Sequence, residues 1–444
     1  MRCHSTLIKI SIVCAALFCL EASGTGLPHA LNEELDAMTP DVESFYRDLH
    51  RNPELSFNEY ATARKLAERV RALGFEVTMG VGGTGVVAIL RNGPGPTVML
   101  RTEMDALPVQ EKTGLPFASS VLARNAAGDA IPVMHACGHD IHMSAWVGTA
   151  QLMADHRALW HGTLMLVGQP AEELVQGSAA MLKDGLFTRF PKPDYALSVH
   201  DESTLPSGQV GYHPGYFRAA ADTVHITIFG QGGHGAAPHD TIDPVVIAAR
   251  VIMALQTVVS RENNPMDPVV ITVGSIHGGT QANIIPDQVQ LQLTVRTFSE
   301  SVRNRVHAAI ARQVKGEAQA ANAPKEPLIE VHRGVDAVYN DPELTARMVR
   351  TLRETMGPQS VVEMPAKMTS EDFANYGLAG AKAVLLHIGA VEPSRLEAAR
   401  QSGKPLPGPH SPQWAPEFKP TIRAAITAET AMLLDLLGNQ SAAP

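Results

Sequence analysis

The stretch ADTVHITIFG, residues 221–230, begins the run of segments that decides the fold of this chain. It has the composition of a β-strand, and a segment with helical periodicity follows at 243–260. The next segments predict strand, strand, helix and strand, at 267–276, 287–298, 301–321 and 327–334. The order βαββαβ is the split ferredoxin-like arrangement, which is complete in itself. We therefore predict an inserted second domain over residues 217–334.

The chain on both sides of this interval alternates short apolar runs with amphipathic segments, which is the pattern of an α/β protein. Helices are predicted at 42–55, 58–74, 342–356 and about 420–437, and buried strands at 84–92, 96–109, 162–170, 194–200 and 382–389. We therefore expect a first domain built from residues 25–216 and 335–444, interrupted by the inserted one.

Residues 1–24 have the features of a secretory signal peptide. Arg2 and Lys9 are basic, ISIVCAALFCL (10–20) is apolar but too short to span a bilayer, and ASG (22–24) resembles a cleavage site. We expect the signal to be removed and the mature chain to be exported, either to a periplasm or to the medium. We expect no membrane-spanning segment in the mature chain.

The charge balance limits the kinds of partner. The net charge of −9 argues against nucleic acid and against an anionic membrane surface. We therefore expect a small molecule as the partner.

One cysteine stands apart from the others. Of four cysteines only Cys137 lies beyond residue 19, so an exported mature chain has no second thiol with which to form a disulfide. His139 follows it in HACGHD (135–140), a loop before a helix predicted from Met143. Thiolate and imidazole together are ligands for zinc or a similar metal. The alternative is a buried free cysteine beside histidines that are already hydrogen-bonded.

Acidic and histidine side chains follow the ends of the predicted strands. Asp105, the pair Glu172 and Glu173, and His200 each lie just past a buried strand, and ligand sites of open α/β sheets form at those carboxyl ends. One glutamate of such a pair can bind a metal while its neighbour activates water. A solvated helix start is the alternative for two adjacent glutamates.

Seven motifs, in this order and at these separations, resemble the dinuclear-metal aminoacylase and carboxypeptidase family, metallopeptidase family 20. They are RTEMDALPV (101–109), HACGHDIHM (135–143), GQPAEE (168–173), GGHGAAPH (232–239), GGTQANIIPD (278–287), VRTF (295–298) and MTSEDFANYG (368–377). The branch is that of the hippurate hydrolases and indoleacetyl-amino-acid hydrolases. The resemblance implies a zinc-exopeptidase-like α/β/α catalytic domain, with the ferredoxin-like domain as a lid.

The resemblance also implies residue roles in the catalytic domain. It implies two divalent ions per chain, with Zn²⁺ as the first expectation and Mn²⁺, Co²⁺ or Ni²⁺ as alternatives. The implied ligands are Cys137, His139, Glu173, His200 and His410. Glu172 would be the general base that takes a proton from a water held between the metals, and Asp105 would orient a ligand imidazole. His387 is the rival of His410, and the Ser-Pro that follows His410 decides for the latter.

Three roles fall on the lid. By the same resemblance His234 would assist the carbonyl oxygen, while Asn283 and Arg296 would receive the free carboxylate of the substrate. Arg296 could instead be a charge at the rim, and Asn283 could simply hold a turn.

Three departures from the family pattern bear on the substrate. Glu103 stands where the family usually has Asp, Thr369 where a small residue is common, and Asp201 and Glu202 where a hydrophobic residue is usual. We expect the last two to add negative charge beside the site and to affect substrate preference more than mechanism.

Together these features predict an exported, metal-dependent amidohydrolase that cleaves N-acyl or N-aroyl amino acids, such as hippurate-, indoleacetyl- or ochratoxin-like substrates. Two alternatives stay open. One is a dipeptidase or carboxypeptidase, in which Asp201 or Glu202 would bind the free amine. The other is a non-catalytic binding protein on the same fold. Apolar residues along 242–260 favour a homo-oligomer formed through the lid.

Overall fold

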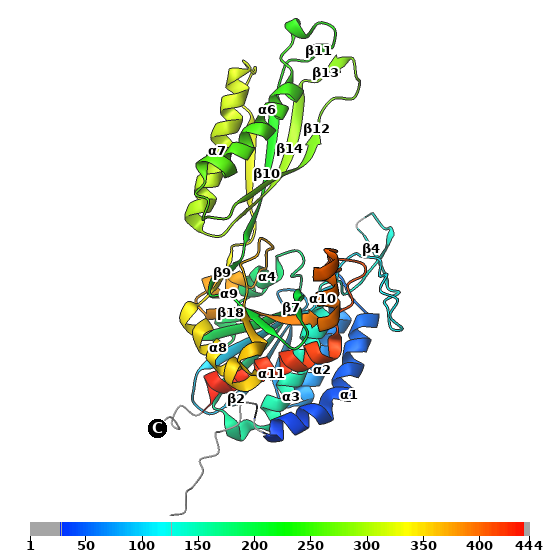
Figure 1. The fold of residues 1–444 in the computed structure, drawn as a ribbon, viewed down its shortest axis with the longest axis vertical. Coiled ribbons are helices and arrows are strands. Elements are labelled where there is room, and N and C mark those ends of the chain that lie inside the picture. Colours follow the sequence, from blue (N-terminus) through cyan, green and yellow to red (C-terminus); the bar gives the residue numbers. More distant parts are fainter. Residues whose placement is uncertain (1–26, 28, 126, 439–444) are drawn as a thin grey trace, which may run out of the picture.

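A computed structural model describes residue 27 and residues 29–125 and 127–438 of the chain. The predicted signal peptide, residues 1–24, lies outside the described residues. Figure 1 shows a large α/β domain with a smaller domain, the lid, standing on it along the long axis of the molecule.

The large domain is built on an eight-stranded mixed sheet. In spatial order its strands are β1 (Glu76–Val81), β2 (Gly85–Asn92), β6 (Gly162–Gln169), β3 (Thr97–Glu103), β7 (Tyr195–Pro206), β18 (Lys382–Val391), β8 (Val210–Tyr212) and β17 (Val361–Glu363). The four central strands β6, β3, β7 and β18 run parallel. Their carboxyl ends therefore meet at one edge of the sheet, where α/β proteins bind their ligands.

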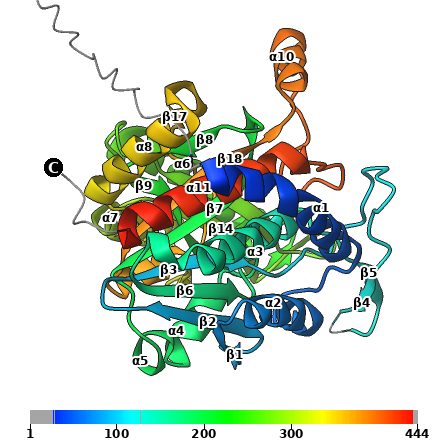
Figure 2. The same ribbon diagram turned by 90° about the horizontal axis from the view of Figure 1, so that it is seen from below.

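Helices cover both faces of this sheet. One face packs against α1 (His29–Arg51), α2 (Tyr60–Ala72), α3 (His139–Asp155), α8 (Pro342–Met356) and α11 (Phe418–Leu437), and the other packs against α4 (Gly177–Lys183), α5 (Leu186–Arg189) and α9 (Ala374–Leu378). Figure 2 shows α1, α3 and α11 side by side.

Strand β2 shows how the sequence produces this layering. Val86, Ala88 and Leu90 face the first group of helices, whereas Val87 and Ile89 face the second. Because side chains alternate across a strand and both faces are covered, the strand is an unbroken apolar run. The predicted α/β/α architecture is confirmed.

Short elements complete the large domain and its junction with the lid. They are the hairpin β4 (Leu122–Arg124) and β5 (Ala130–Pro132), the helix α10 (Pro393–Ser402), and the paired strands β9 (Gly215–Arg218) and β16 (Val338–Asn340), which flank the lid in sequence.

The lid is a four-stranded antiparallel sheet with the order β12 (Val270–His277), β14 (Gln288–Thr297), β10 (Ala220–Phe229) and β15 (Leu328–Arg333). Its helices α6 (Pro244–Thr257) and α7 (Glu300–Ala320) pack on one face through their own apolar core. The chain order is βαββαβ, so the predicted ferredoxin-like domain is confirmed. Two short strands, β11 (Gly233–His234) and β13 (Ile284–Ile285), pair with each other.

One helix of the lid is strongly apolar. In the described part of the chain, the helix Pro244–Glu262, which is α6 with its π-helical continuation, is long and apolar enough to pass a composition test for a membrane span. Its buried side chains, among them Ile247, Val251 and Leu255, belong to the core beneath the lid sheet. Part of its apolar composition therefore serves packing within the lid.

Candidate metal centre

The five predicted metal ligands come together at the carboxyl edge of the large sheet. The donor atoms of Cys137, His139 and His200 lie within 4.8 Å of one another, and so do those of Cys137, Glu173 and His410. Cys137 belongs to both groups, so two three-ligand groups lie next to each other. They lie at a cavity of about 630 Å³ between the large domain and the lid.

The loop around Cys137 is tightly constrained. Gly138 has φ 75°, and a Cβ at that position would collide with the carboxylate of Asp201. Only glycine takes that backbone and that space without strain. Helix α3 then begins at His139, four residues earlier than the sequence predicted, so this ligand lies on the first turn of a buried helix.

Backbone carbonyls fix the two buried ligand imidazoles. Nδ1 of His139 lies 2.7 Å from the carbonyl oxygen of Asp105, and Nδ1 of His200 lies 2.8 Å from that of Asp201. Because a carbonyl only accepts hydrogen bonds, each Nδ1 carries the hydrogen and each Nε2 is free to donate its lone pair to a metal. Nε2 of His139 is buried and has no hydrogen-bond partner among the described residues.

The remaining ligands are also oriented toward this centre. Oε1 of Glu173 is buried without a hydrogen-bond partner among the described residues, and its Oε2 lies 3.2 Å from Nε2 of His410. His410 has φ 69°, an uncommon conformation for a residue with a side chain, and its N–H donates to the carbonyl of Ala136 at 2.7 Å. The loop that carries His410 is thus hydrogen-bonded directly to the HACGHD segment.

Asp105 holds the glutamate pair. Its carboxylate accepts hydrogen bonds from the backbone N–H groups of Glu172 at 3.1 Å and Glu173 at 3.0 Å, and from Ser56 Oγ at 2.7 Å. The sequence predicted that Asp105 orients an imidazole; its nearest contact with that imidazole is made by the backbone carbonyl, while the carboxylate positions the two glutamates. The turn is strained, since Ala171 and Val175 on either side both have positive φ.

The ionisation of the cluster is consistent with a cation. Burial, together with Glu371 and Glu173, raises the pKa of Glu172 well above its usual range. Burial and Glu173 raise the pKa of Cys137. Burial alone would lower the pKa of His139, but Asp105 and Cys137 raise it overall. A divalent ion reverses each tendency by stabilising thiolate, carboxylate and neutral imidazole. The donor set and the two unpartnered buried donor atoms fit such an ion.

A buried charge network that the sequence did not reveal lies next to the Glu172 carboxylate. Arg101 is fully buried, pairs with Glu103, and lies 2.8 Å from Glu371 and 3.1 Å from Asp372. Glu371 and Asp372 lie within 4.8 Å of the Glu172 carboxylate. The motifs contain these residues, but nothing in their spacing shows that a mid-strand arginine and the SEDF segment meet.

The unusual acidic residues are paired rather than free. Asp201 is buried, accepts from Trp414 Nε1 at 3.0 Å and lies 3.4 Å from His142, which also contacts Glu103. Glu202 pairs with Lys367 and lies 2.9 Å from Nδ1 of His387. Both residues line the cavity, where the sequence predicted added negative charge, and each has cationic or hydrogen-bonding partners there.

The rival histidine does not join the centre. His387 lies in the middle of β18, is fully buried, and accepts from Nη2 of Arg218 at 2.9 Å. It belongs to none of the metal-capable groups found among the described residues, whereas His410 does.

The lid delivers only one of its three predicted residues to the cavity. Arg296 lines the cavity and donates a hydrogen bond to Ser370 Oγ. His234 on β11 and Asn283 just before β13 are exposed and do not line it. Figure 1 shows both short strands at the end of the lid that points away from the large domain.

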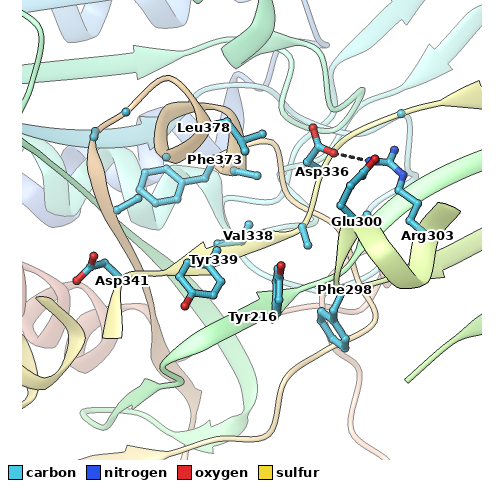
Figure 3. A pocket seen from close by; sticks show the side chains of 18 of the residues that line it. Tyr216, Phe298, Glu300, Arg303, Asp336, Val338, Tyr339, Asp341, Phe373 and Leu378 are labelled. Carbon is cyan, nitrogen blue, oxygen red and sulfur yellow. Dashed lines mark hydrogen bonds and ion pairs between the residues drawn. The ribbon is translucent and has the colours of Figure 1, made fainter. Parts of the chain in front are cut away.

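A larger cavity, about 1070 Å³, lies at the junction of lid and large domain and contains none of the predicted site residues. Figure 3 shows aromatic side chains, among them Tyr216, Tyr339 and Phe298, along its wall, and Asp336 beside Arg303. Arg303 and Arg333 are each paired with acidic partners here. This cavity offers no metal-ligand group among the described residues.

Known proteins are similar to this chain in sequence and in fold. The model of the family described as Peptidase family M20/M25/M40 matches residues 99–399. Thermostable carboxypeptidase 2 of Saccharolobus solfataricus is 37% identical, over 74% of this chain and 81% of its own. IAA-amino acid hydrolase ILR1-like 2 of Arabidopsis thaliana is 32% identical, over 74% of this chain and 72% of its own. The solved structure of Bacillus subtilis YXEP, described as a dinuclear metal binding peptidase from the M20 family, superposes with a TM-score of 0.74 at 27% identity, covering 90% of this chain and all of that one.

Proposed function

Since the chain belongs to the peptidase family M20/M25/M40 and is a metal-dependent hydrolase of carbon–nitrogen bonds, we propose that it cleaves the amide bond of N-acyl or N-aroyl amino acids. The observation that carries the proposal is the position of Glu172. Its carboxylate lies beside the metal-ligand groups in a cavity that the lid residue Arg296 also lines.

We propose that two divalent ions bind here, Zn²⁺ first and Mn²⁺, Co²⁺ or Ni²⁺ as alternatives. Their ligands would be Cys137, His139, Glu173, His200 and His410. When bound, such ions polarise an amide carbonyl and lower the pKa of water. The mixture of thiolate, imidazole and carboxylate suits these borderline metals better than Mg²⁺ or Ca²⁺.

Glu172 performs the proton transfers in this proposal. It accepts the proton of the attacking water and delivers it to the nitrogen of the leaving amine. A carboxylate in this position can take up the proton in the first step and release it in the second. Asp105 keeps the carboxylate in place by accepting the backbone N–H of Glu172. Arg296 receives the free carboxylate of the amino-acid product.

The paired state of Asp201 and Glu202 favours acylated substrates over peptides. A dipeptide has a free α-ammonium group that needs an acidic partner. Asp201 is held by His142, His200 and Trp414, and Glu202 by Lys367. Lys367 neutralises Glu202, and Trp414 donates to one oxygen of Asp201, so we rank the dipeptidase or carboxypeptidase second, although relatives such as thermostable carboxypeptidase 2 carry that name.

The test is release of free amino acid from a substrate panel by protein reconstituted with Zn²⁺ or Mn²⁺. The panel holds hippurate, indoleacetyl-alanine, an N-benzoyl-phenylalanine and matched dipeptides. We expect cleavage of the acylated compounds and little cleavage of the dipeptides. Cleavage of the dipeptides alone would establish the peptidase. Less than about one metal per chain with no hydrolysis would establish a non-catalytic binding protein.

We further propose a homo-oligomer formed through the lid. Helix α6 exposes apolar side chains, with Val246 55% and Met253 69% exposed. In such an oligomer, His234 and Asn283 would act in the catalytic cavity of a second copy. Light scattering measures the mass, and mixing Glu172→Gln with His234→Ala tests the sharing of sites. Recovery of activity in the mixture is expected, and a monomeric protein would contradict the proposal.

We also propose that the protein is exported after removal of residues 1–24. Its support is the charge and apolar pattern of that segment alone. N-terminal sequencing of the protein recovered from the extracytoplasmic fraction tests it, and an intact Met1 in the cytoplasm would contradict it.

A further inference from the structure

Arg218, the last residue of β9, lines the proposed catalytic cavity and is 8% exposed. Two of its five N–H donors are used, by Thr369 Oγ1 and by Nε2 of His387. Its Nε is buried without a hydrogen-bond partner among the described residues. The guanidinium is thus fixed in orientation and incompletely satisfied within the chain.

Arg218 also lacks a counter-charge. Among the residues that the structure describes, no carboxylate lies within ion-pair distance of it, and its partner His387 is an imidazole, which carries no negative charge. Lys367, another cation of the cavity, is by contrast neutralised by Glu202. A buried cation without an anion is costly, and a carboxylate ligand would remove that cost.

A second arginine of the cavity is anchored on the same loop. Arg296 donates to Ser370 Oγ, and Arg218 donates to Thr369 Oγ1, so consecutive residues of one loop hold the two guanidinium groups. Among the described residues Arg296 likewise has no carboxylate within ion-pair distance. Both arginines line the same cavity, which can therefore receive more than one negative charge.

We infer that Arg218 is a specificity-determining residue that binds a second carboxylate of the substrate, so that the preferred substrates are N-acyl derivatives of aspartate or glutamate. This inference rests on the proposed function and names its substrate class. Arg296 takes the α-carboxylate and Arg218 the side-chain carboxylate. Both arginines are anchored on adjacent residues, so the two carboxylates that they bind should be close together. Two carboxylates of one amino acid meet this condition, whereas carboxylates on opposite sides of the cleaved amide would lie further apart.

The departures from the family pattern agree with this assignment. Thr369, where a small residue is common, supplies the hydroxyl that accepts from Arg218. Glu202, where a hydrophobic residue is usual, lies against the far nitrogen of His387, whose other nitrogen accepts from Arg218. Two separate departures in the sequence thus lead to the same guanidinium.

The test compares N-acetyl-L-glutamate with N-acetyl-L-glutamine, which differ only in the second carboxylate. We expect the wild-type protein to show a kcat/KM at least about 10-fold higher for the glutamate compound. In Arg218→Met we expect the KM for N-acetylglutamate to rise about 10- to 100-fold, with kcat and the KM for N-acetylglutamine within about 3-fold of wild type. Arg218→Lys should restore part of the loss.

Arg305→Met is the matched control, because Arg305 lies half-exposed on α7 and pairs with Asp267, away from the cavity. It should change neither substrate. An equal loss for both compounds in Arg218→Met would overturn the inference, since Arg218 would then bind the α-carboxylate.

The wild-type comparison decides the matter even if Arg218→Met does not fold. A wild-type protein that cleaves hippurate but does not prefer N-acetylglutamate to N-acetylglutamine overturns this inference alone. A protein that cleaves no acylated amino acid overturns the proposed function and this inference with it.

Discussion

The predicted residues of the large domain converge, whereas those of the lid separate. Cys137, His139 and His200 come from segments far apart in the chain, yet their donor atoms lie within 4.8 Å of one another. In the lid, Arg296 reaches the cavity while His234 and Asn283 stay at the far end.

The difference has a topological cause. Strands β3, β6 and β7 are hydrogen-bonded neighbours, so the residues that follow them are held at one edge of one sheet. The lid joins that domain through two chain crossings, near β9 and β16, and its far end is positioned by the lid alone. Residues at the end of one sheet are therefore fixed relative to one another, whereas the far end of the lid shares no sheet with the large domain.

The largest effect on activity is expected when the proposed general base of the large domain is removed. Glu172→Gln keeps the shape and removes the proton acceptor, so we expect kcat to fall about 10²- to 10⁴-fold with two metals still bound. Elemental analysis and product release measure both quantities. Glu326→Gln, an exposed lid carboxylate paired with Lys315, is the control and should behave as wild type. Full activity in Glu172→Gln would show that another group is the base.

Loss of the shared ligand is the next largest effect. Cys137 belongs to both ligand groups, so Cys137→Ser should leave less than about one bound ion per chain. His410 belongs to only one group, and His410→Ala should retain about one ion. Metal analysis after dialysis distinguishes the two variants. Equal metal content in both variants would mean that the groups are not two sites.

Removal of the Asp105 carboxylate separates its two roles. In Asp105→Ala the backbone carbonyl still holds His139, but the N–H groups of Glu172 and Glu173 lose their acceptor. We expect activity to fall about 10- to 100-fold while the sites still bind metal. Metal titration beside steady-state kinetics tests this. Either a complete loss of metal binding or an unchanged activity would contradict the assigned role.

The smallest effect is expected in the lid. Asp243 caps α6, where its carboxylate accepts from the N–H groups of Val245 and Val246. Asp243→Ala should cost about 1 kcal/mol of lid stability and leave the metal sites untouched. Denaturant unfolding with hydrogen exchange resolved by domain measures the effect. A change in metal affinity would show that the lid and the centre are more tightly coupled than their topology indicates.

Most of the fold was predictable from the sequence. Helix α8 runs from Pro342 to Met356, the range that its periodicity predicted, and the lid has the predicted order of elements. The reason is that periodicity and capping are local properties: they report which face of a segment is buried and where it ends. The predicted ligands in HACGHD, at Glu173, at His200 and at His410 also meet, because each follows or flanks an element whose position the sheet fixes.

Partners of buried charges were decided by the tertiary structure alone. The sequence predicted negative charge beside the site at Asp201 and Glu202 but not their partners, which the structure supplies. The structure also brings Arg101 to Glu371 across 270 residues of chain. Such pairings depend on which strands become neighbours and on how the loops return to them. The sequence by itself determined the elements and the chemical groups, and only the packed structure determined which groups compensate one another and which, like Arg218, are left for a ligand.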